Sequence, residues 1–418
     1  MPYIKIFSII VLTLFFTPCT RGQQIEERIP PPNIKSIVLN PHKVNNYVPL
    51  IRLGESFSLS FDDLNGDRKF YSYKIEHCNY KWESSGLSVS EYLSGFQSDR
   101  IRNYEDSFNT FQNYTHYRIT IPNSNMKIKI TGNYIISVLD EDNSVLFTRR
   151  VIVYQPRANV EVSVHRSRDI AFIDQKHDVE FVIFSGNLNL RDPMQDIKVA
   201  VYQNMDWNTV RTDIPPKYIT NGKLLYNYVS DISFWAGNEY LYFDSKEIRN
   251  ATNNIAKTRL DEIFNTYLYI DEERYNKAYS FYPDINGNFV LRTIDTDNIS
   301  VEGDYSLVHF KLDTKQTLIE DKVYVYGAYN DWKITDENRM TFNEQTRLYE
   351  VAIPFKQGFY NYTYVTAGED KKVNIHKIEG SYFQTENEYT VVVYLKQFGD
   401  RYTQVVGIGS SNSKELQN

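Results

Sequence analysis

The chain has 418 residues and a formal net charge of −7, and its 46 Lys and Arg residues form no basic cluster. This acidic balance argues against nucleic acid and against an anionic membrane surface as binding partners. Aromatic residues make up 15% of the chain, which is typical of half-buried pleated sheets rather than of helices. At about 150 residues per domain, the length predicts two or three domains.

Residues 1–22 are predicted to form a signal peptide. Lys5 gives a short positive start and residues 6–16 are apolar, with small residues before the expected cleavage point. The apolar run is too short for a transmembrane helix, so we expect an exported protein with no direct membrane insertion. A lipid on Cys19 is the alternative, but Pro18 directly before it does not suit that kind of cleavage.

Removal of the signal peptide would leave Cys78 as the only cysteine. An exported chain with one cysteine has no internal disulfide, so packing must stabilise it. We expect Cys78 to be a small buried apolar residue rather than a nucleophile.

Residues 30–156 are predicted to form an N-terminal β-sandwich. Phe57, Leu59 and Phe61 alternate with serines, and this period of two is typical of a strand. About seven short strands with turns between them favour a sandwich. Asn65-Gly66 between two alternating runs predicts a hairpin, and the acidic residues around it lack the closing ligand of a calcium loop.

A long aromatic segment, residues 71–117, interrupts this first domain. It begins and ends as strand, but the part between is rich in large rings, which a solvated loop would normally avoid. The segment either folds back over its own sandwich or contacts another molecule. The residues predicted to bind a partner are Tyr104, Phe108, Phe111 and Tyr114.

Two further β-rich domains are predicted, over residues 157–314 and 315–400. Both contain alternating apolar residues, for example Val160, Val162 and Val164 at the start of the second domain. Residues 401–418 lose this periodicity and are expected to form a flexible tail. The sequence therefore predicts an all-β fold of tandem β-sandwich domains of immunoglobulin-like or E-set-like type.

Residues 327–332, GAYNDW, follow a predicted strand and resemble the opening of starch- and glycogen-binding β-sandwich modules. The resemblance implies a carbohydrate-module-like fold for the third domain. Trp332 would then be the candidate glycan-binding residue of an exported glycan-binding protein, which is the alternative function. In that fold the same tryptophan can also be a packing residue.

No pattern of a known catalytic site is present. The sequence lacks the nucleophile, zinc and phosphate-loop motifs, and no two of its seven histidines have the spacing of metal ligands on a helix. His77 and His116 flank the aromatic segment, where a hydrogen-bonding role is the simpler interpretation. We therefore predict a protein that is not an enzyme and that uses no cofactor or metal.

Several segments, read together, resemble the Plug protein family of the bacterial type IX secretion system. They include residues 77–82 (HCNYKW), 91–96 (EYLSGF), 114–117 (YTHY), 237–240 (GNEY) and 303–305 (GDY). The resemblance covers most of the mature chain, with Thr131 as a minor departure, and is weakest in the third domain.

This resemblance implies a non-enzymatic periplasmic protein associated with the outer membrane. Its partner would be the β-barrel translocon, whose periplasmic opening it would bind and whose pore it would plug when no substrate is in transit. A wide water-filled barrel leaks solutes unless its lumen is occupied, so such a plug must be folded and rigid. Aromatic side chains supply rigid contact area at low entropic cost.

Overall fold

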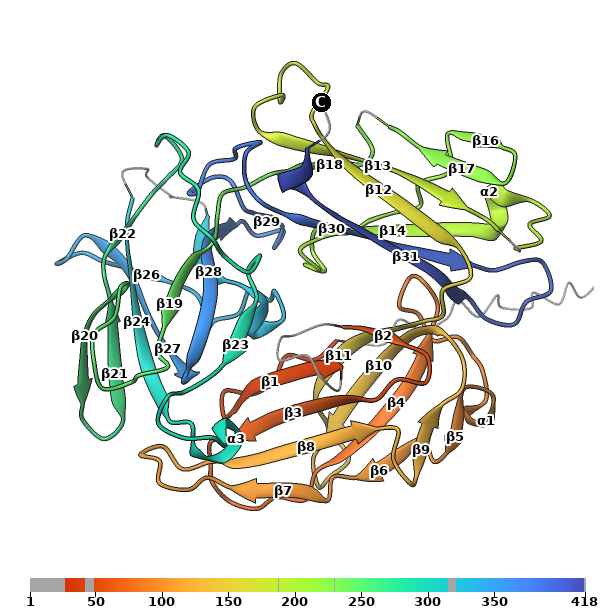
Figure 1. Ribbon diagram of the computed structural model, residues 1–418. Helices are drawn as coiled ribbons and strands as arrows, with labels where there is room; N and C mark the ends of the chain where they lie inside the picture. Colours follow the sequence, from red (N-terminus) through yellow and green to blue (C-terminus); the bar gives the residue numbers. More distant parts are fainter. Residues whose placement is uncertain (1–26, 42–48, 187, 229, 315–320, 417–418) are drawn as a thin grey trace, which may run out of the picture.

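The computed structural model describes residues 27–41, 49–186, 188–228, 230–314 and 321–416. The predicted signal peptide lies outside these residues. The described chain forms three β-sandwiches, which confirms the predicted all-β class. In Figure 1 the first sandwich lies at the bottom, the second at the upper right and the third at the left.

The first sandwich packs a four-stranded sheet, β1-β3-β8-β7, against a five-stranded sheet, β2-β11-β10-β4-β6. Its elements are β1 (Ile34–Pro41), β2 (Leu50–Arg52), β3 (Phe57–Asp63), β4 (Ser72–Cys78), α1 (Val89–Tyr92), β5 (Leu93–Gly95), β6 (Ser98–Arg100), β7 (Asn103–Asp106), β8 (Thr115–Ile121), β9 (Met126–Ile128), β10 (Gly132–Leu139) and β11 (Val145–Tyr154). Phe57, Leu59 and Phe61 of β3 are buried, as their alternation predicts.

The turn at Asn65-Gly66 is not the predicted hairpin. It connects β3 to β4, which lie in opposite sheets of the sandwich. The Asp63 carboxylate beside it is buried and accepts hydrogen bonds from Asn33 Nδ2 (2.7 Å) and the Tyr71 hydroxyl (2.8 Å). Protein donors thus satisfy this carboxylate, and the turn carries the chain from one sheet to the other.

The second sandwich is built from two separate parts of the chain. One sheet contains β12, β13, β17, β16 and β18, and the other has the order β15-β14-β30-β31. Its elements are β12 (Asn159–Arg166), β13 (Lys176–Phe184), α2 (Pro193–Asp196), β14 (Ile197–Gln203), β15 (Arg211–Thr212), β16 (Tyr218–Thr220), β17 (Lys223–Tyr226), β18 (Ser233–Trp235), β30 (Glu388–Leu395), β31 (Gln404–Asn412) and η2 (Ser413–Glu415).

The third sandwich is inserted between β18 and β30 of the second. One sheet is formed by β19, β28, β23, β25 and β29, and the other by β20, β21, β24, β27, β26 and β22. Its elements are β19 (Leu241–Asp244), β20 (Ile255–Leu260), β21 (Phe264–Leu268), β22 (Asp271–Glu272), β23 (Phe289–Leu291), α3 (Ile299–Glu302), β24 (Tyr305–Asp313), β25 (Lys322–Tyr326), η1 (Ala328–Asn330), β26 (Thr341–Asn343), β27 (Leu348–Lys356), β28 (Gly358–Ala367) and β29 (Val373–Asn374).

The structure therefore corrects the predicted boundaries after residue 156. Strands β19 to β24, predicted in domain 157–314, belong to the third sandwich, and β30, predicted in domain 315–400, belongs to the second. The expected flexible tail, 401–418, contains the edge strand β31, which pairs with β30 over eight residue pairs from Glu388↔Asn412 to Leu395↔Gln404. Alternation marks a strand, but it does not say which strand is its partner.

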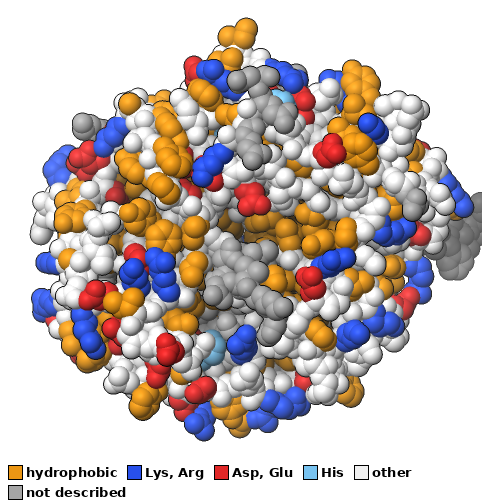
Figure 2. All heavy atoms as spheres, in the orientation of Figure 1, with side chains coloured by type: hydrophobic (Ala, Val, Ile, Leu, Met, Phe, Trp, Pro, Cys, Tyr) orange, Lys and Arg blue, Asp and Glu red, His pale blue; other side chains and the backbone are white. Residues whose placement is uncertain are grey.

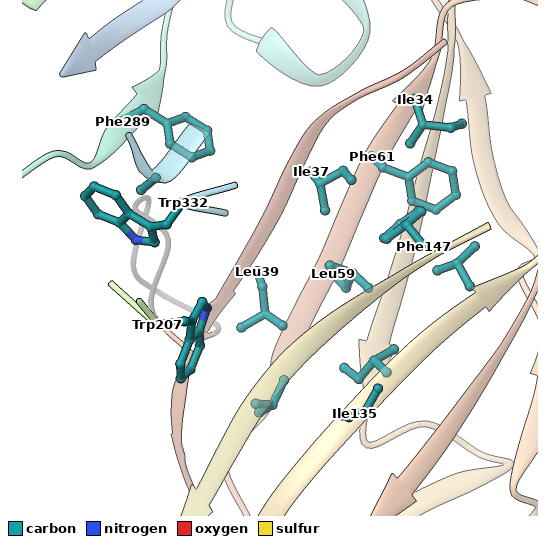
Figure 3. Close-up of a cluster of buried hydrophobic side chains, with 14 of the residues drawn as sticks. Ile34, Ile37, Leu39, Leu59, Phe61, Ile135, Phe147, Trp207, Phe289 and Trp332 are labelled. Atoms are coloured by element: carbon teal, nitrogen blue, oxygen red, sulfur yellow. The ribbon is translucent and has the colours of Figure 1, made fainter. Parts of the chain in front are cut away.

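The β14–β30 sheet is buried on both faces, and this joins the three sandwiches. Val391 and Val393 point into the core of the second sandwich, whereas Val392 and Tyr394 join the core shared by the first and third. Figure 3 shows Trp207 next to Leu39 of β1, with Trp332 and Phe289 of the third sandwich nearby. One apolar cluster thus includes side chains from all three sandwiches and fixes their arrangement, beside a separate core inside the second sandwich.

Positive and negative side chains are mixed over the face of the molecule shown in Figure 2. No helix among the described residues is long and apolar enough to cross a membrane.

Candidate protein-binding surface

The aromatic segment, residues 71–117, forms short elements along one side of the first sandwich. After β4 it passes through α1, β5, β6 and β7 and returns in β8. Ser88 and Glu91 form a capping box at the start of α1, which stabilises this single turn of helix. The segment is therefore ordered structure, and its far end, residues 107–114, reaches the third sandwich.

Residues 107–114 are fixed to the third sandwich by backbone hydrogen bonds. The Phe108 N–H donates to the Val301 carbonyl (2.8 Å), and the Phe111 N–H donates to Asp304 Oδ2 (2.9 Å). The Phe111 ring packs edge-on against Phe264, with centroids 5.2 Å apart. Much of the aromatic segment thus contacts another part of its own chain, but the contact crosses between sandwiches.

The four predicted partner-binding residues divide into two pairs. Tyr114 is fully buried and donates its hydroxyl hydrogen bond to the Gly303 carbonyl (2.8 Å), while Tyr104 is half-buried against Tyr117. Phe108 is 68% exposed and Phe111 is 51% exposed. The first pair has an internal packing role, and only the second pair presents its rings to solvent.

Leu260 extends the exposed surface around Phe108 and Phe111. It lies directly across the β20–β21 hairpin from Phe264, the ring that contacts Phe111, and is 45% exposed. We call Phe108, Phe111 and Leu260 the corner surface. The sequence did not predict Leu260, because no local pattern shows that its strand partner Phe264 contacts Phe111.

A buried polar cluster lies between the first and third sandwiches. Asp62 Oδ2 accepts hydrogen bonds from Lys356 Nζ (2.7 Å) and from the Tyr305 hydroxyl (2.7 Å), and His116 Nδ1 lies 2.6 Å from Asp62 Oδ1. We call Asp62, His116, Tyr305 and Lys356 the Asp62 cluster. Burial alone would raise the pKa of Asp62, but the Lys356 ammonium and the His116 hydrogen bond lower it.

A second junction joins all three sandwiches. The rings of Trp82 and Trp207 meet edge to face with centroids 5.6 Å apart, and the Arg150 guanidinium lies over both, at 4.7 and 5.4 Å. Trp207 Nε1 donates to Asp331 Oδ1 of the third sandwich (3.1 Å). Aromatic and cation–π contacts of this kind stabilise a junction beyond the area they bury.

Trp332 belongs to the interior of this junction. It is 1% exposed, its ring packs against Tyr326 with centroids 5.3 Å apart, and a Cβ on Gly287 would lie only 2.3 Å from it. Its carbonyl accepts a hydrogen bond from Asn208 of the second sandwich (2.7 Å). Neither ring face is open for a sugar to stack on, so the packing alternative describes Trp332 in this structure.

The sequence comparison decides the family. A profile described as the first domain of type 9 secretion system plug proteins matches residues 34–155, which span the first sandwich. The chain belongs to the type 9 secretion system plug family. Family membership gives it a role related to type 9 secretion, and the whole aromatic segment lies within the matched domain.

The structural comparison extends the similarity over most of the plug-family chain. The crystal structure of a hypothetical protein from Parabacteroides merdae is 31% identical, with a TM-score of 0.88 over 92% of this chain and 98% of that chain. Trypsin-activated α2-macroglobulin from Escherichia coli matches with 8% identity and a TM-score of 0.20, over 93% of this chain and 24% of that chain. A TM-score of 0.20 is too low to indicate a shared fold. No curated protein matches the chain.

The cysteine and the two histidines considered above form no reactive or metal-binding site in this plug-family protein. Burial raises the pKa of the Cys78 thiol to about 12, so the thiol is unreactive at neutral pH. His77 and His116 lie in opposite sheets and do not meet. Among the described residues, no group of three His, Cys, Asp or Glu side chains could hold a metal ion.

Proposed function

We propose that the chain is a periplasmic subunit that binds the periplasmic opening of the type 9 secretion translocon, an outer-membrane β-barrel, and plugs its pore when no substrate is in transit. The observation that carries this proposal is the match of residues 34–155 to the plug family. The family is a non-enzymatic component of secretion, which agrees with a binding role.

The rigidity of the three-sandwich body supports this role. A plug must resist deformation in an aqueous barrel, and here the sandwiches share one apolar cluster, a buried ion pair and the Trp82–Trp207 junction. Removing one partner of a buried ion pair is strongly destabilising, so movement of one sandwich away from another is unfavourable. The three sandwiches are therefore expected to move as one rigid body.

The corner surface is our candidate for contact with the translocon. Phe108 and Phe111 are exposed rings whose backbones are fixed by hydrogen bonds to Val301 and Asp304. Exposed rings held on a rigid backbone lose little entropy when a partner covers them. Leu260 adds apolar area beside them.

The experiment that tests this function is an envelope permeability assay in the native host. Deletion of the chain is expected to admit a large antibiotic that the outer membrane normally excludes, and simultaneous depletion of the barrel is expected to abolish the leak. The tagged protein should also purify with the barrel from detergent-solubilised envelopes. An unchanged permeability barrier after deletion, with the barrel still present, would overturn the proposal.

The structure gives no support to the alternative function of glycan binding. It depended on an accessible Trp332, and this side chain is buried.

A further inference from the structure

Two short segments connect the second sandwich to the inserted third sandwich. Residues 236–240 lead from β18 to β19, and residues 375–387 return from β29 to β30. The two segments are bound to each other, since the Asn387 side chain donates a hydrogen bond to the Ala236 carbonyl (2.8 Å). We call these two segments the crossing. Movement of the third sandwich relative to the second would have to change the contacts of the crossing.

The crossing contains a buried carboxylate, that of Glu239, which has no exposed surface. Its Oε1 accepts hydrogen bonds from the Tyr279 hydroxyl (2.5 Å) and the Glu386 backbone N–H (3.1 Å), but its Oε2 has no donor among the described residues. The described residues supply no cationic partner either, since Arg274 pairs with Glu379 and donates only to the Glu239 backbone carbonyl (2.8 Å). A buried carboxylate without a counter-charge is costly, and such a group normally takes up a proton.

A second carboxyl group, that of Asp284, lies beside Glu239. Burial raises the pKa of Glu239, whereas hydrogen bonds with Tyr279 and Asp284 lower it. The Asp284 oxygens already accept hydrogen bonds from the backbone N–H groups of Tyr240 (2.6 Å) and Asn286 (2.7 Å). Two ionised carboxylates have no donor between them, so a hydrogen bond between Glu239 and Asp284 requires one proton. That proton would also supply the donor that Glu239 Oε2 lacks.

The charges around the two carboxyl groups favour a bound proton. Burial, together with the negative charges of Glu239 and Glu386, raises the pKa of Asp284 from 3.8 to about 7, although hydrogen bonds from backbone N–H groups oppose this. Glu386 itself forms an ion pair with Lys414, so it has its own counter-charge. The proton is therefore held by Glu239 and Asp284.

A metal ion is the other cation that could neutralise two adjacent carboxylates. Calcium takes roughly six to eight oxygen ligands. Among the residues that the structure describes, no three metal-binding side chains are placed to hold an ion. A proton needs only the two carboxyl oxygens that it joins.

We propose that Glu239 and Asp284 share one proton, and that this shared proton holds the crossing between the second and third sandwiches closed. When the proton is lost, two negative charges face each other in a buried site and Glu239 Oε2 again has no donor. The crossing is therefore most stable in acid and less stable in neutral and alkaline solution. This inference concerns the body of the protein and does not rest on the proposed function.

The expected pH dependence follows from the difference between the closed and the opened crossing. In the closed crossing the two groups keep their proton up to about pH 7, whereas in an opened or unfolded chain Asp284 loses its proton near pH 3.8. Opening should therefore become easier by at most about tenfold for each pH unit between these values. Above about pH 7 it should change no further, because the proton is then lost in both states.

Urea denaturation of the purified mature protein at several pH values between 4.5 and 8.5 tests the proposal. The variant Glu239→Gln keeps an oxygen for Tyr279 and gains an amide that can donate to Asp284 without a shared proton. The urea midpoint of the wild type minus that of the variant should fall as the pH rises to about 7 and then stay constant. Other titrating groups are common to both proteins and cancel. A difference that does not change with pH would overturn the proposal.

Glu161→Gln is the matched control, because it removes an exposed carboxylate from β12 of the second sandwich. Its difference from the wild type should not follow the same pH course, and an identical course in both variants would overturn the proposal. Calcium at alkaline pH gives a second control. If calcium raises the urea midpoint of the wild type but not that of Glu239→Gln, the carboxylates bind a metal ion and the proposal is wrong.

Infrared spectroscopy detects the proton itself, whatever its effect on stability. A protonated carboxyl group has a C=O stretching band that an ionised carboxylate lacks. The wild type at pH 6 should show such a band in excess of Glu239→Gln, and this excess should disappear by pH 8.5. Equal bands in the two proteins at pH 6 would overturn the proposal.

Hydrogen exchange of the Glu386 backbone N–H measures opening at the crossing. This group donates to Glu239 Oε1, so its protection reports whether the two segments stay together. After correction for the intrinsic exchange rate, its protection should fall between pH 5 and 7 in the wild type and change less in Glu239→Gln. Protection that follows the same pH course in both proteins would show that the proton does not hold the crossing closed.

Discussion

Asp62 and Lys356 form a fully buried ion pair of 2.7 Å, although 294 residues separate them in the chain. Asp62 is the next-to-last residue of β3 in the first sandwich, and Lys356 is the last residue of β27 in the third. Lys356 also donates to the Ser300 carbonyl (2.8 Å) and lies 4.1 Å from the centroid of the Tyr114 ring. The Lys356 ammonium group thus contacts the first sandwich through Asp62, the third through Ser300, and the aromatic segment through Tyr114.

Replacing Lys356 with Met should lower the free energy of unfolding by about 3–5 kcal/mol, because it leaves the Asp62 carboxylate buried without its counter-charge. Urea denaturation followed by fluorescence measures the loss. The double variant Asp62→Asn/Lys356→Met should be more stable than Lys356→Met alone, since no buried charge remains. A double variant as unstable as the sum of the two single variants would contradict this account.

Gly287→Ala should lower the free energy of unfolding by about 2–4 kcal/mol, since Gly287 has φ +78° and the new Cβ would lie 2.3 Å from Trp332. Gly54→Ala is the matched control. Gly54 has φ +92° with no atom within 4 Å of the added Cβ. The Gly54→Ala substitution therefore measures backbone strain alone and should lower the free energy of unfolding by less. The new Cβ would also lie 2.7 Å from the Tyr240 ring. The added cost of Gly287→Ala should therefore shrink but not vanish in a Trp332→Leu background, and an unchanged cost there would contradict a clash with Trp332.

His177 should make stability depend on pH. It is fully buried, with Nδ1 2.9 Å from the Tyr389 hydroxyl, and burial lowers its pKa from 6.5 to about 4. Between these values the unfolded chain holds the extra proton, so this residue's contribution to stability falls as the pH decreases from 6.5 to 4, by at most roughly 1.4 kcal/mol per pH unit.

The variant His177→Gln removes this titration and should flatten the dependence. Urea midpoints of both proteins at several pH values between 4 and 7.5 give the comparison. If the difference between variant and wild type does not change with pH, the native histidine does not titrate as described.

Phe108 and Tyr114 should respond in opposite ways to substitution. Phe108→Ser is expected to leave the free energy of unfolding nearly unchanged, because the ring is 68% exposed, but to reduce recovery of the translocon in a pull-down. Tyr114→Phe should lower the free energy of unfolding by about 1–2 kcal/mol, because the buried Gly303 carbonyl loses its donor, while recovery of the translocon persists.

Phe398→Ser is the matched control for surface apolarity, since Phe398 is 94% exposed at the tip of the β30–β31 connection. If Phe398→Ser reduces recovery of the translocon as much as Phe108→Ser does, the corner surface is not the specific contact.

Local patterns in the sequence predicted the strands well, because alternation of apolar residues directly reflects burial on one face. The burial of Phe57, Leu59 and Phe61 illustrates this. The same patterns did not predict strand partners. The run from Val391 to Tyr394 is apolar at every position because both faces of β30 are buried. The sequence of this run does not show that its two faces pack into two different cores.

The candidate site was predictable only in part. An aromatic segment of unusual composition pointed to the correct part of the chain, but exposure could not be assigned residue by residue. Tyr114 is buried and Phe111 is half-exposed because of Gly303 and Asp304, which lie about 190 positions later. The Asp62 cluster was missed for the same reason, since its lysine partner belongs to another sandwich.

The pairing of β14 with β30 determines when the second sandwich can be completed. Seven residue pairs join the two strands, from Ile197↔Leu395 to Gln203↔Tyr389, so β14 lacks this neighbour until residues 388–395 have been synthesised. Contacts between residues so distant in sequence form slowly. Until then β14 has an unpaired edge, and a chain shortened by its last thirty or so residues would retain that defect permanently.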